Sequence, residues 1–332
     1  NARLTNYLKE SKKGGDKAVV RPGLVLDAQA SGVGNGLVVF DNHLVSVYGT
    51  TLGFDTTAAG SAGFTTYPIG LVTGQSLDSV FISSGLWAFS VWDSDLEEGY
   101  VYSGDPESSI SENSIGFVGS TGGIYGMASS GTSLVVANDT VLYRTATGGP
   151  FSFSLKVGPT TVFSEVYYKS GRYVAIGGAY ATTMPLWYSV DDGVNWTSAS
   201  ITTGATYESS ARGVTFDGIR WLVVGYTTTI SGGSNTTRIY STTDFVSYSE
   251  LTLSGLPAAF IIYGIYYASG TYFINGLGTV YKVYSSTDAA SWTEVATFSG
   301  LAVYMCETGD DEVLCSTVAS GIYKSSSGTF QV

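Results

Sequence analysis

The chain has 332 residues and a formal net charge of −12 at pH 7. This length allows one large all-β domain or two ordinary domains, and so acidic a surface will not attract nucleic acid nonspecifically. No apolar run is long enough to span a bilayer, so we expect no membrane insertion. The 43 glycines and 24 tyrosines, without long runs of Ala, Leu, Glu and Lys, predict many short strands and few helices.

Residues 1–30 differ from the rest of the chain and predict an extended N-terminal arm. A lysine-rich stretch precedes an apolar segment that contains a Pro-Gly turn at Pro22 and Gly23. Residues 24–26 are too apolar to be left in water, so we favour a docking arm, or a strand that closes the fold, over a frayed terminus. The candidate interface residues of this arm are Asn6, Tyr7, Lys9, Lys12, Lys13 and Arg21.

From Gly36 onward a pattern recurs at a spacing of roughly forty to fifty residues, which is typical of propeller blades. Each unit has an apolar strand, a small polar turn, a second apolar strand, a tyrosine-containing strand and a polar-aromatic strand. Seven units can be counted. Their second strands are expected at 44–48, 86–91, 134–137, 173–176, 221–225, 272–275 and 313–316.

A four-stranded unit of this size cannot bury both of its faces alone, whereas units stacked around an axis bury each other. We therefore predict an all-β chain in which residues 31–332 form a single β-propeller of seven four-stranded blades. Residues 23–26 could close the ring beside residues 329–332. A pair of β-sandwiches and an open solenoid are the rival architectures.

Residues 188–196 indicate the tip of a β-hairpin. The carboxylate of Asp191 can accept backbone N–H bonds within the turn, and Gly193 can adopt positive φ. The stretch resembles the Asp-box, Ser-x-Asp-x-Gly-x-x-Trp, through Ser189, Asp191, Gly193 and Trp196. That motif marks hairpin turns in β-propellers, including sialidases, and its role there is structural.

Two later stretches repeat the order Tyr-Ser-x-x-Asp-x-x-(Asn or Ser)-aromatic. One contains Asp244 and Tyr248, and the other contains Asp288 and Trp292. Both copies lack the glycine, and their Ser–Asp spacing is shifted by one residue. We predict that Trp196, Tyr248 and Trp292 occupy equivalent buried positions in successive blades, each near a turn aspartate.

A sialidase-like hydrolase would need three arginines that clamp a carboxylate, an acid/base Asp and a Tyr–Glu nucleophile pair. Arg144, Arg172 and Arg238 are the plausible clamp, because they come from three different units. Two of them belong to expected third strands and Arg172 to a turn. We therefore expect the three guanidinium groups to be scattered, and we assign no catalytic residue.

The sequence also favours the absence of metal ions and cofactors. The acidic loop around residues 93–98 could hold Ca²⁺, but it lacks the pattern of a calcium loop, so a solvated acidic tip is favoured. Its acidic residues are Asp93, Asp95, Glu97 and Glu98. His43 is the sole histidine, which argues against zinc.

The two cysteines, Cys306 and Cys315, would face each other across a hairpin loop at 309–312. This spacing allows a cross-strand disulfide. Two buried, reduced thiols are favoured, because a pair of cysteines makes no disulfide framework.

About fifty N-terminal residues are similar to the start of a known family. The similarity runs through residues 5–7, 21–24, 34–37 and 47–52, with Phe40, Asn42 and Leu44 between them. It resembles the tail-hub proteins of short-tailed bacteriophages, also called packaged-DNA stabilisation or nozzle proteins. In that family an arm carrying Asn-Tyr or Asn-Cys continues through Pro-Gly-Leu into a propeller. The family brings no catalytic residues.

The resemblance implies a non-enzymatic virion structural protein that oligomerises into a ring around the DNA exit channel. Its expected partners are further copies of itself, the portal or adaptor, other tail proteins and double-stranded DNA in transit without sequence recognition. It implies location in the virion tail after assembly in the bacterial host cytoplasm. An acidic wall suits such a channel, because repelled DNA does not adhere to it. The alternative is an Asp-box propeller that binds or hydrolyses cell-surface glycans.

Overall fold

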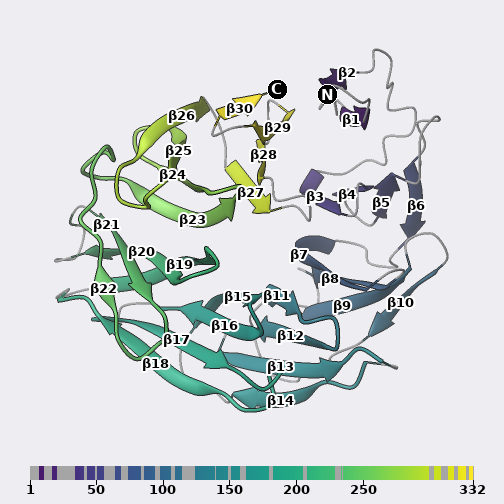
Figure 1. The fold of residues 1–332 in the computed structure, drawn as a ribbon. Coiled ribbons are helices and arrows are strands. Elements are labelled where there is room, and N and C mark those ends of the chain that lie inside the picture. The colour runs from purple at the N-terminus through teal and green to yellow at the C-terminus, as the bar shows by residue number, and fades with distance from the viewer. Residues whose placement is uncertain are drawn as a thin grey trace.

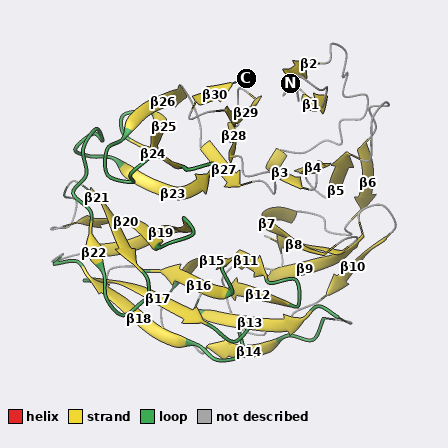
Figure 2. Ribbon diagram, in the orientation of Figure 1, coloured by secondary structure: helices red, strands yellow, loops and turns green. Residues whose placement is uncertain are grey.

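The structure is a computed structural model that consists of strands, turns and loops (Figure 2). It describes most of residues 124–298, with gaps at 139, 149–150, 158–161, 179–181, 205–207, 229–232 and 234, and elsewhere the strands alone. These described residues form thirty strands and no helix. No helix that could cross a membrane occurs among them.

Twenty-eight of the strands form seven four-stranded antiparallel sheets, which we call blades 1 to 7. Blades 1 and 2 are β3 (Gly34–Phe40), β4 (His43–Tyr48), β5 (Thr51–Asp55), β6 (Phe64–Pro68), then β7 (Gly74–Ser83), β8 (Leu86–Asp93), β9 (Glu98–Asp105), β10 (Ser109–Asn113). Blades 3 and 4 are β11 (Ile124–Ser129), β12 (Ser133–Asn138), β13 (Val141–Ala146), β14 (Ser154–Val157), then β15 (Phe163–Lys169), β16 (Arg172–Gly177), β17 (Thr183–Ser189), β18 (Thr197–Thr202). Blades 5 to 7 are β19 (Glu208–Phe216), β20 (Trp221–Thr228), β21 (Thr236–Thr242), β22 (Ser249–Glu250), then β23 (Ile261–Ala268), β24 (Thr271–Leu277), β25 (Tyr281–Ser286), β26 (Thr293–Phe298), then β27 (Val303–Glu307), β28 (Val313–Thr317), β29 (Gly321–Ser326), β30 (Thr329–Gln331).

The blades are arranged as a ring (Figure 1). The first strand of each blade lies nearest the axis and contacts the first strand of the next, from β3 through β7, β11, β15, β19 and β23 to β27. The fourth strands form the rim. The chain is thus a single seven-bladed β-propeller, as predicted, and neither a sandwich pair nor an open solenoid. The residues proposed to close the ring, 23–26, lie outside the described residues.

The second strands were predicted most accurately, because burial on both faces makes them continuous apolar runs. β12 and β20 are buried along their whole length. Their side chains meet those of the neighbouring blades. For example, one core cluster joins Val174 and Leu186 of blade 4 to Val223 and Tyr240 of blade 5.

The N-terminal arm contains a strand pairing that the sequence analysis did not predict. Its described residues are extended, and they pair as a two-stranded antiparallel sheet of β1 (Tyr7–Glu10) and β2 (Lys17–Val20), separate from the seven blades. Tyr7 and Lys9 therefore belong to β1. Asn6, Lys12, Lys13 and Arg21 lie outside the described residues.

The possible disulfide is contradicted by the strand register of blade 7. Met305 is opposite Cys315, and Cys306 is opposite Leu314, so the two cysteines are one position out of register. Successive residues of a strand alternate between its faces, so the pair does not face each other. Cys315 is a buried, reduced thiol, which agrees with the favoured reading for that residue.

Candidate functional site

The Asp-box of blade 4 is a turn closed by its own side chains. It connects β17 to β18. The Ser189 hydroxyl lies 2.8 Å from Asp191 Oδ1 and accepts the Gly193 N–H at 3.0 Å. Asp191 accepts the backbone N–H of Asn195 at 2.9 Å and its side-chain amide at 2.7 Å. Trp196 Nε1 donates to the Gly193 carbonyl at 3.0 Å, so every motif residue holds another.

The two later copies are closer to the motif than their sequences suggested. Their turn hydroxyls come from Thr242 and Ser286, one residue after the serines we aligned. Thr242 lies 3.1 Å from Asp244 Oδ1, and Ser286 lies 2.8 Å from Asp288 Oδ1. The Ser–Asp spacing is therefore the same in all three boxes, and the predicted shift was wrong.

What differs is the length of the turn after the aspartate. In blade 4 two residues, Asp192 and Gly193, have positive φ, of 60° and 79°. In blades 5 and 6 a single residue has it, Phe245 at 60° and Ala289 at 64°. Asp192 is thus an additional residue, and glycine is dispensable in the shorter turns.

The three aromatic residues hold equivalent places but are buried to different degrees. Trp292 is 4% exposed, whereas Trp196 and Tyr248 are partly buried. The Tyr248 hydroxyl donates to the Phe245 carbonyl at 3.1 Å, as Trp196 does to Gly193. Such a polar tip must stay near the turn surface, which explains why burial was overestimated. Trp292 Nε1 is buried without a described hydrogen-bond partner.

The box aspartates are ionised structural groups. Backbone hydrogen bonds from the turn are the largest cause that lowers the pKa of Asp191, Asp244 and Asp288. A carboxylate that accepts several N–H bonds is a poor proton donor near neutral pH. These groups are therefore suited to fixing turns and unsuited to general acid catalysis.

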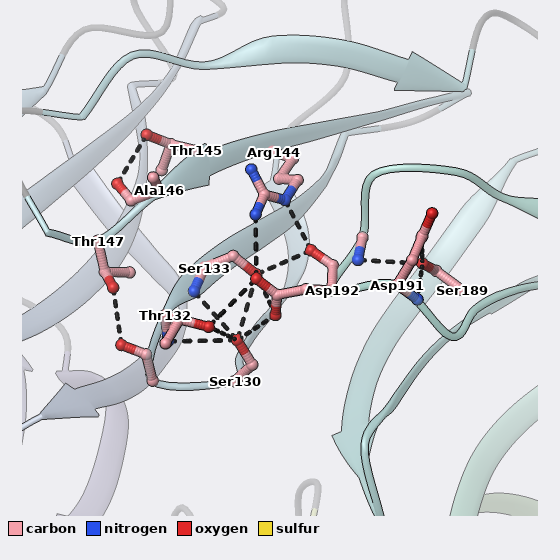
Figure 3. A network of polar contacts seen from close by, with 12 residues as sticks. Ser130, Thr132, Ser133, Arg144, Thr145, Ala146, Thr147, Ser189, Asp191 and Asp192 are labelled. Carbon is pink, nitrogen blue, oxygen red and sulfur yellow. Dashed lines mark hydrogen bonds and ion pairs between the residues drawn. The ribbon is translucent and has the colours of Figure 1, made fainter.

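The additional residue Asp192 joins blade 4 to blade 3 (Figure 3). Its carboxylate accepts hydrogen bonds from Ser130, from Ser133 at 2.9 Å and from Thr132 at 3.1 Å, all in the turn between β11 and β12 or just after it. Arg144 of β13 donates from Nη2 to Asp192 Oδ2 at 3.0 Å and from Nε to its carbonyl at 2.6 Å. Burial alone would raise the pKa of Asp192, but these hydrogen bonds outweigh it and lower the pKa.

Tyr173 completes this contact, which we call the blade 3–4 seam. Its hydroxyl accepts the Ser130 backbone N–H at 2.9 Å and lies 2.7 Å from the Ser133 hydroxyl. The ring itself is fully buried. The seam therefore combines a buried apolar part, the Tyr173 ring, with a network of polar hydrogen bonds. This network lies at the end of the propeller that carries the box turns.

The blade 4–5 seam is aromatic at the corresponding place. Phe245, the positive-φ residue of the second box, is 2% exposed and stacks on Tyr188 of blade 4 at 5.2 Å between centroids. It also contacts Trp221 at 5.2 Å. Arg172 lies over the Phe245 ring at 6.0 Å and donates to the Thr243 carbonyl at 3.5 Å.

The blade 5–6 seam is again polar. Tyr272 of β24 donates its hydroxyl to Asp217 Oδ2 at 2.5 Å, and Arg220 pairs with the same carboxylate at 3.3 Å. Arg220 also donates to the Asp288 carbonyl of the third box at 3.3 Å. In each of these three seams an arginine of one blade therefore binds a backbone carbonyl of the next blade's box turn.

The three clamp arginines have separate partners. Arg144 is bound to Asp192, Arg172 lies against Phe245, and Arg238 is paired with Glu250 of its own blade. As expected from the sequence, Arg144 and Arg238 belong to third strands, whereas Arg172, which was expected in a turn, is the first residue of the second strand β16. The arrangement disperses their charges among structural contacts.

The acidic loop of blade 2 is described only where it is strand. Asp93 ends β8 and Glu98 begins β9, while Asp95 and Glu97 lie outside the described residues. His43 is the first residue of β4. The described residues contain no group of three or more His, Cys, Asp or Glu side chains that could hold a metal ion.

A feature missed by the sequence analysis is a β-bulge in the first strand of six blades. The register against the second strand slips by one residue at equivalent places in β3, β7, β11, β15, β19 and β23. The bulged residues are Asn35, Leu77, Tyr125, Ser164, Arg212 and Tyr263. In four of these blades the residue after the bulge is glycine. A glycine just before the apolar run of a first strand was therefore the feature of the sequence that could have indicated the bulge.

Close backbone contact explains one further glycine in each of blades 4, 5 and 6. Opposite the bulges lie Gly177, Gly225 and Gly276. A Cβ on Gly225 would lie 2.1 Å from the Ser210 carbonyl oxygen, and one on Gly177 would lie 1.8 Å from that of Val162. The bulge presses a carbonyl against the second strand, where no side chain fits.

The bulges of blades 5 and 6 bring five side chains together, which we call the axial cluster: Glu208, Arg212, Tyr226, Tyr263 and Tyr281. Arg212 Nη2 donates to the Tyr226 hydroxyl at 3.0 Å, and that hydroxyl donates to Glu208 at 2.8 Å. The Arg212 guanidinium also lies 5.2 Å from the centre of the Tyr226 ring. The exposed Tyr263 ring lies 6.1 Å from that of Tyr281.

Comparison with known proteins supports the architecture. No family model matches the sequence, and no curated protein matches it. Among solved structures, the chain is similar to "YCF48 bound to D1 peptide", with a TM-score of 0.52 and 13% identity over 77% of this chain and 80% of that chain. At this identity the likeness shows the fold alone, and the fold is that of a β-propeller.

Proposed function

We propose that this protein is a non-enzymatic structural component of a short-tailed bacteriophage tail, where copies assemble into a ring around the DNA exit channel. The main support for a non-enzymatic role is that the box aspartates and the dispersed arginines are engaged in structural contacts. Asp192, Arg144 and Arg172 each bind across a seam between blades. Groups so engaged rigidify a scaffold and are not available to a substrate.

The tail role rests on the N-terminal similarity to tail-hub proteins, carried by residues 5–7, 21–24, 34–37 and 47–52. The fold is compatible with it, because a propeller offers a rigid body with a separate N-terminal hairpin, β1–β2. The peptide in the YCF48 structure gives a precedent for a similar propeller that holds another polypeptide. In this proposal the portal or adaptor and other tail proteins are the partners.

Measurement of particle mass tests the proposal. Light scattering and electron micrographs of the full chain should show a closed ring of several copies. The variant Lys9→Ala/Lys12→Ala/Lys13→Ala should stay folded and assemble less, because these charges belong to the proposed docking arm. A monomer at all concentrations would contradict the ring, and turnover of a sialoside that disappears in Arg172→Ala would favour the hydrolase instead.

A further inference from the structure

The axial cluster has no role in the structural account given above. It lies at the end of the ring opposite the box turns, because Glu208 begins β19 and Tyr281 begins β25, while both box and first turns lie at the other ends of these strands. Arg212 and Tyr263 are bulged residues of neighbouring first strands. A bulge re-aims a side chain and is often found next to binding sites.

The described residues satisfy only part of the hydrogen-bonding capacity of the Arg212 guanidinium. Of its five N–H groups, described residues accept one, through the Tyr226 hydroxyl. Its Nε is buried without a hydrogen-bond partner among described residues. Arg212 also forms no ion pair with a described carboxylate, in contrast to Arg144, Arg220 and Arg238. A guanidinium with unsatisfied donors and no ion pair to a described carboxylate favours an anionic ligand.

Beside this charge is an aromatic surface that solvent reaches. Tyr263 is 38% exposed although a large aromatic side chain is normally buried, and Tyr281 next to it is partly buried. Burial raises the pKa of the Tyr263 hydroxyl, Tyr281 adds to this effect, and nearby Arg212 opposes it. The two aromatic rings and the Arg212 cation are therefore near neighbours, and the Glu208 carboxylate is linked to Arg212 through the Tyr226 hydroxyl.

These groups fit a compact acidic ligand better than a long one. The bulges interrupt the hydrogen-bonding edges of the first strands, which disfavours addition of an extended peptide as a further strand. The net charge of −12 disfavours a polyanion such as nucleic acid. A sugar ring offers an apolar face for tyrosine and hydroxyls for Glu208, and a carboxyl group on it would match Arg212.

We propose that the axial cluster binds a carboxylate-bearing sugar of the hexuronic acid class. Its ring would lie on Tyr263 and Tyr281, its carboxylate against Arg212, and a hydroxyl would donate to Glu208. Binding involves no bond cleavage and does not depend on the tail role proposed above.

Titration of the full-length chain with D-glucuronate tests this, by calorimetry and saturation-transfer NMR. Glucuronate should bind saturably, and D-glucose and acetate, which each lack one half of the match, should bind at least about tenfold more weakly. Arg212→Gln should remove the preference for glucuronate over glucose, while Arg212→Lys should keep part of it. Tyr263→Ala should weaken both sugars.

The matched control is Tyr125→Ala, which removes the bulged tyrosine of blade 3, itself 44% exposed. Its affinity for glucuronate should equal that of the unaltered chain. Absence of saturable binding to glucuronate would overturn the proposal, as would equal losses in Tyr125→Ala and Tyr263→Ala. If Arg212→Gln does not fold, the selectivity of Tyr263→Ala and of Arg212→Lys decides the outcome.

Discussion

The blade 3–4 and blade 4–5 seams solve the same packing problem with opposite chemistry. In the first, the positive-φ turn residue Asp192 enters a network of hydroxyls and Arg144. In the second, the box turn lacks this additional residue, and Phe245, which matches Gly193 in its backbone hydrogen bond to the first hydroxyl of the box, stacks on Tyr188. The length of the box turn and the identity of its positive-φ residues therefore decide whether charge or apolar area joins the blades.

The largest expected effect is in the aromatic seam. Phe245→Ala should lower the free energy of unfolding by about 3–5 kcal/mol, as truncation of a buried aromatic ring does. Chemical denaturation followed by tryptophan fluorescence measures it. Val246→Ala is the control, because Val246 is 75% exposed on the same turn. Equal losses in the two variants would show that the stacking seen here does not stabilise the ring.

In the polar blade 3–4 seam, Asp192→Asn should lower the free energy of unfolding by about 1–3 kcal/mol, because it replaces charge-assisted hydrogen bonds by neutral ones. Asparagine tolerates positive φ, so the backbone is not strained by the change. The same denaturation assay applies. A loss as large as that of Phe245→Ala would make the two seams energetically alike and remove the distinction drawn between them.

A smaller effect is expected from Tyr173→Phe, about 1 kcal/mol, since the buried ring is kept and its hydroxyl bonds to Ser130 and Ser133 are lost. Tyr168→Phe is the control, because the Tyr168 ring packs on Tyr173 at 4.7 Å without sharing those bonds. An unchanged free energy of unfolding in Tyr173→Phe would show that the buried ring, and not the hydroxyl hydrogen bonds, stabilises this seam.

The pH dependence separates the seams further. The pKa of Asp192 is lower in the folded chain than its ordinary value, so its stabilising effect is present above that ordinary value, near 3.8, and is lost as pH falls through the folded pKa. The penalty of Asp192→Asn should therefore shrink between pH 6 and about pH 2–3, whereas that of Phe245→Ala should stay constant. Parallel pH profiles for the two variants would contradict this assignment.

How much of this was readable from the sequence varied with the kind of interaction. Second strands such as 173–176 were predicted because doubly buried strands are continuous apolar runs. The boxes were recognised through Asp191 and its copies, since a turn carboxylate acts within a few residues. The error at Ser241 and Ser285 arose because adjacent hydroxyl residues, Thr242 and Ser286, offered two alignments that sequence alone cannot separate.

The seam contacts and the axial cluster could not be predicted in the same way. Asp192 and Ser130 are 62 positions apart, and which residue of a box turn faces the preceding blade depends on one inserted residue. Likewise Arg212 approaches Tyr263 because of two bulges, and a bulge leaves little trace in composition. The glycines that follow the bulged residues can be seen in the sequence. They could not be recognised as marking bulges, because a bulge is defined by the register against the second strand.

A double-mutant cycle between Asp192→Asn and Arg144→Gln tests most directly whether the additional box residue joins blades 3 and 4. Unfolding free energies of both single variants and the double variant give the coupling energy, and a second cycle of Arg144→Gln with Asp244→Asn of blade 5 is the reference. We expect coupling of about 1 kcal/mol or more in the first cycle and near additivity in the second. Additivity within about 0.3–0.5 kcal/mol in the first cycle would contradict the structural role assigned to the box.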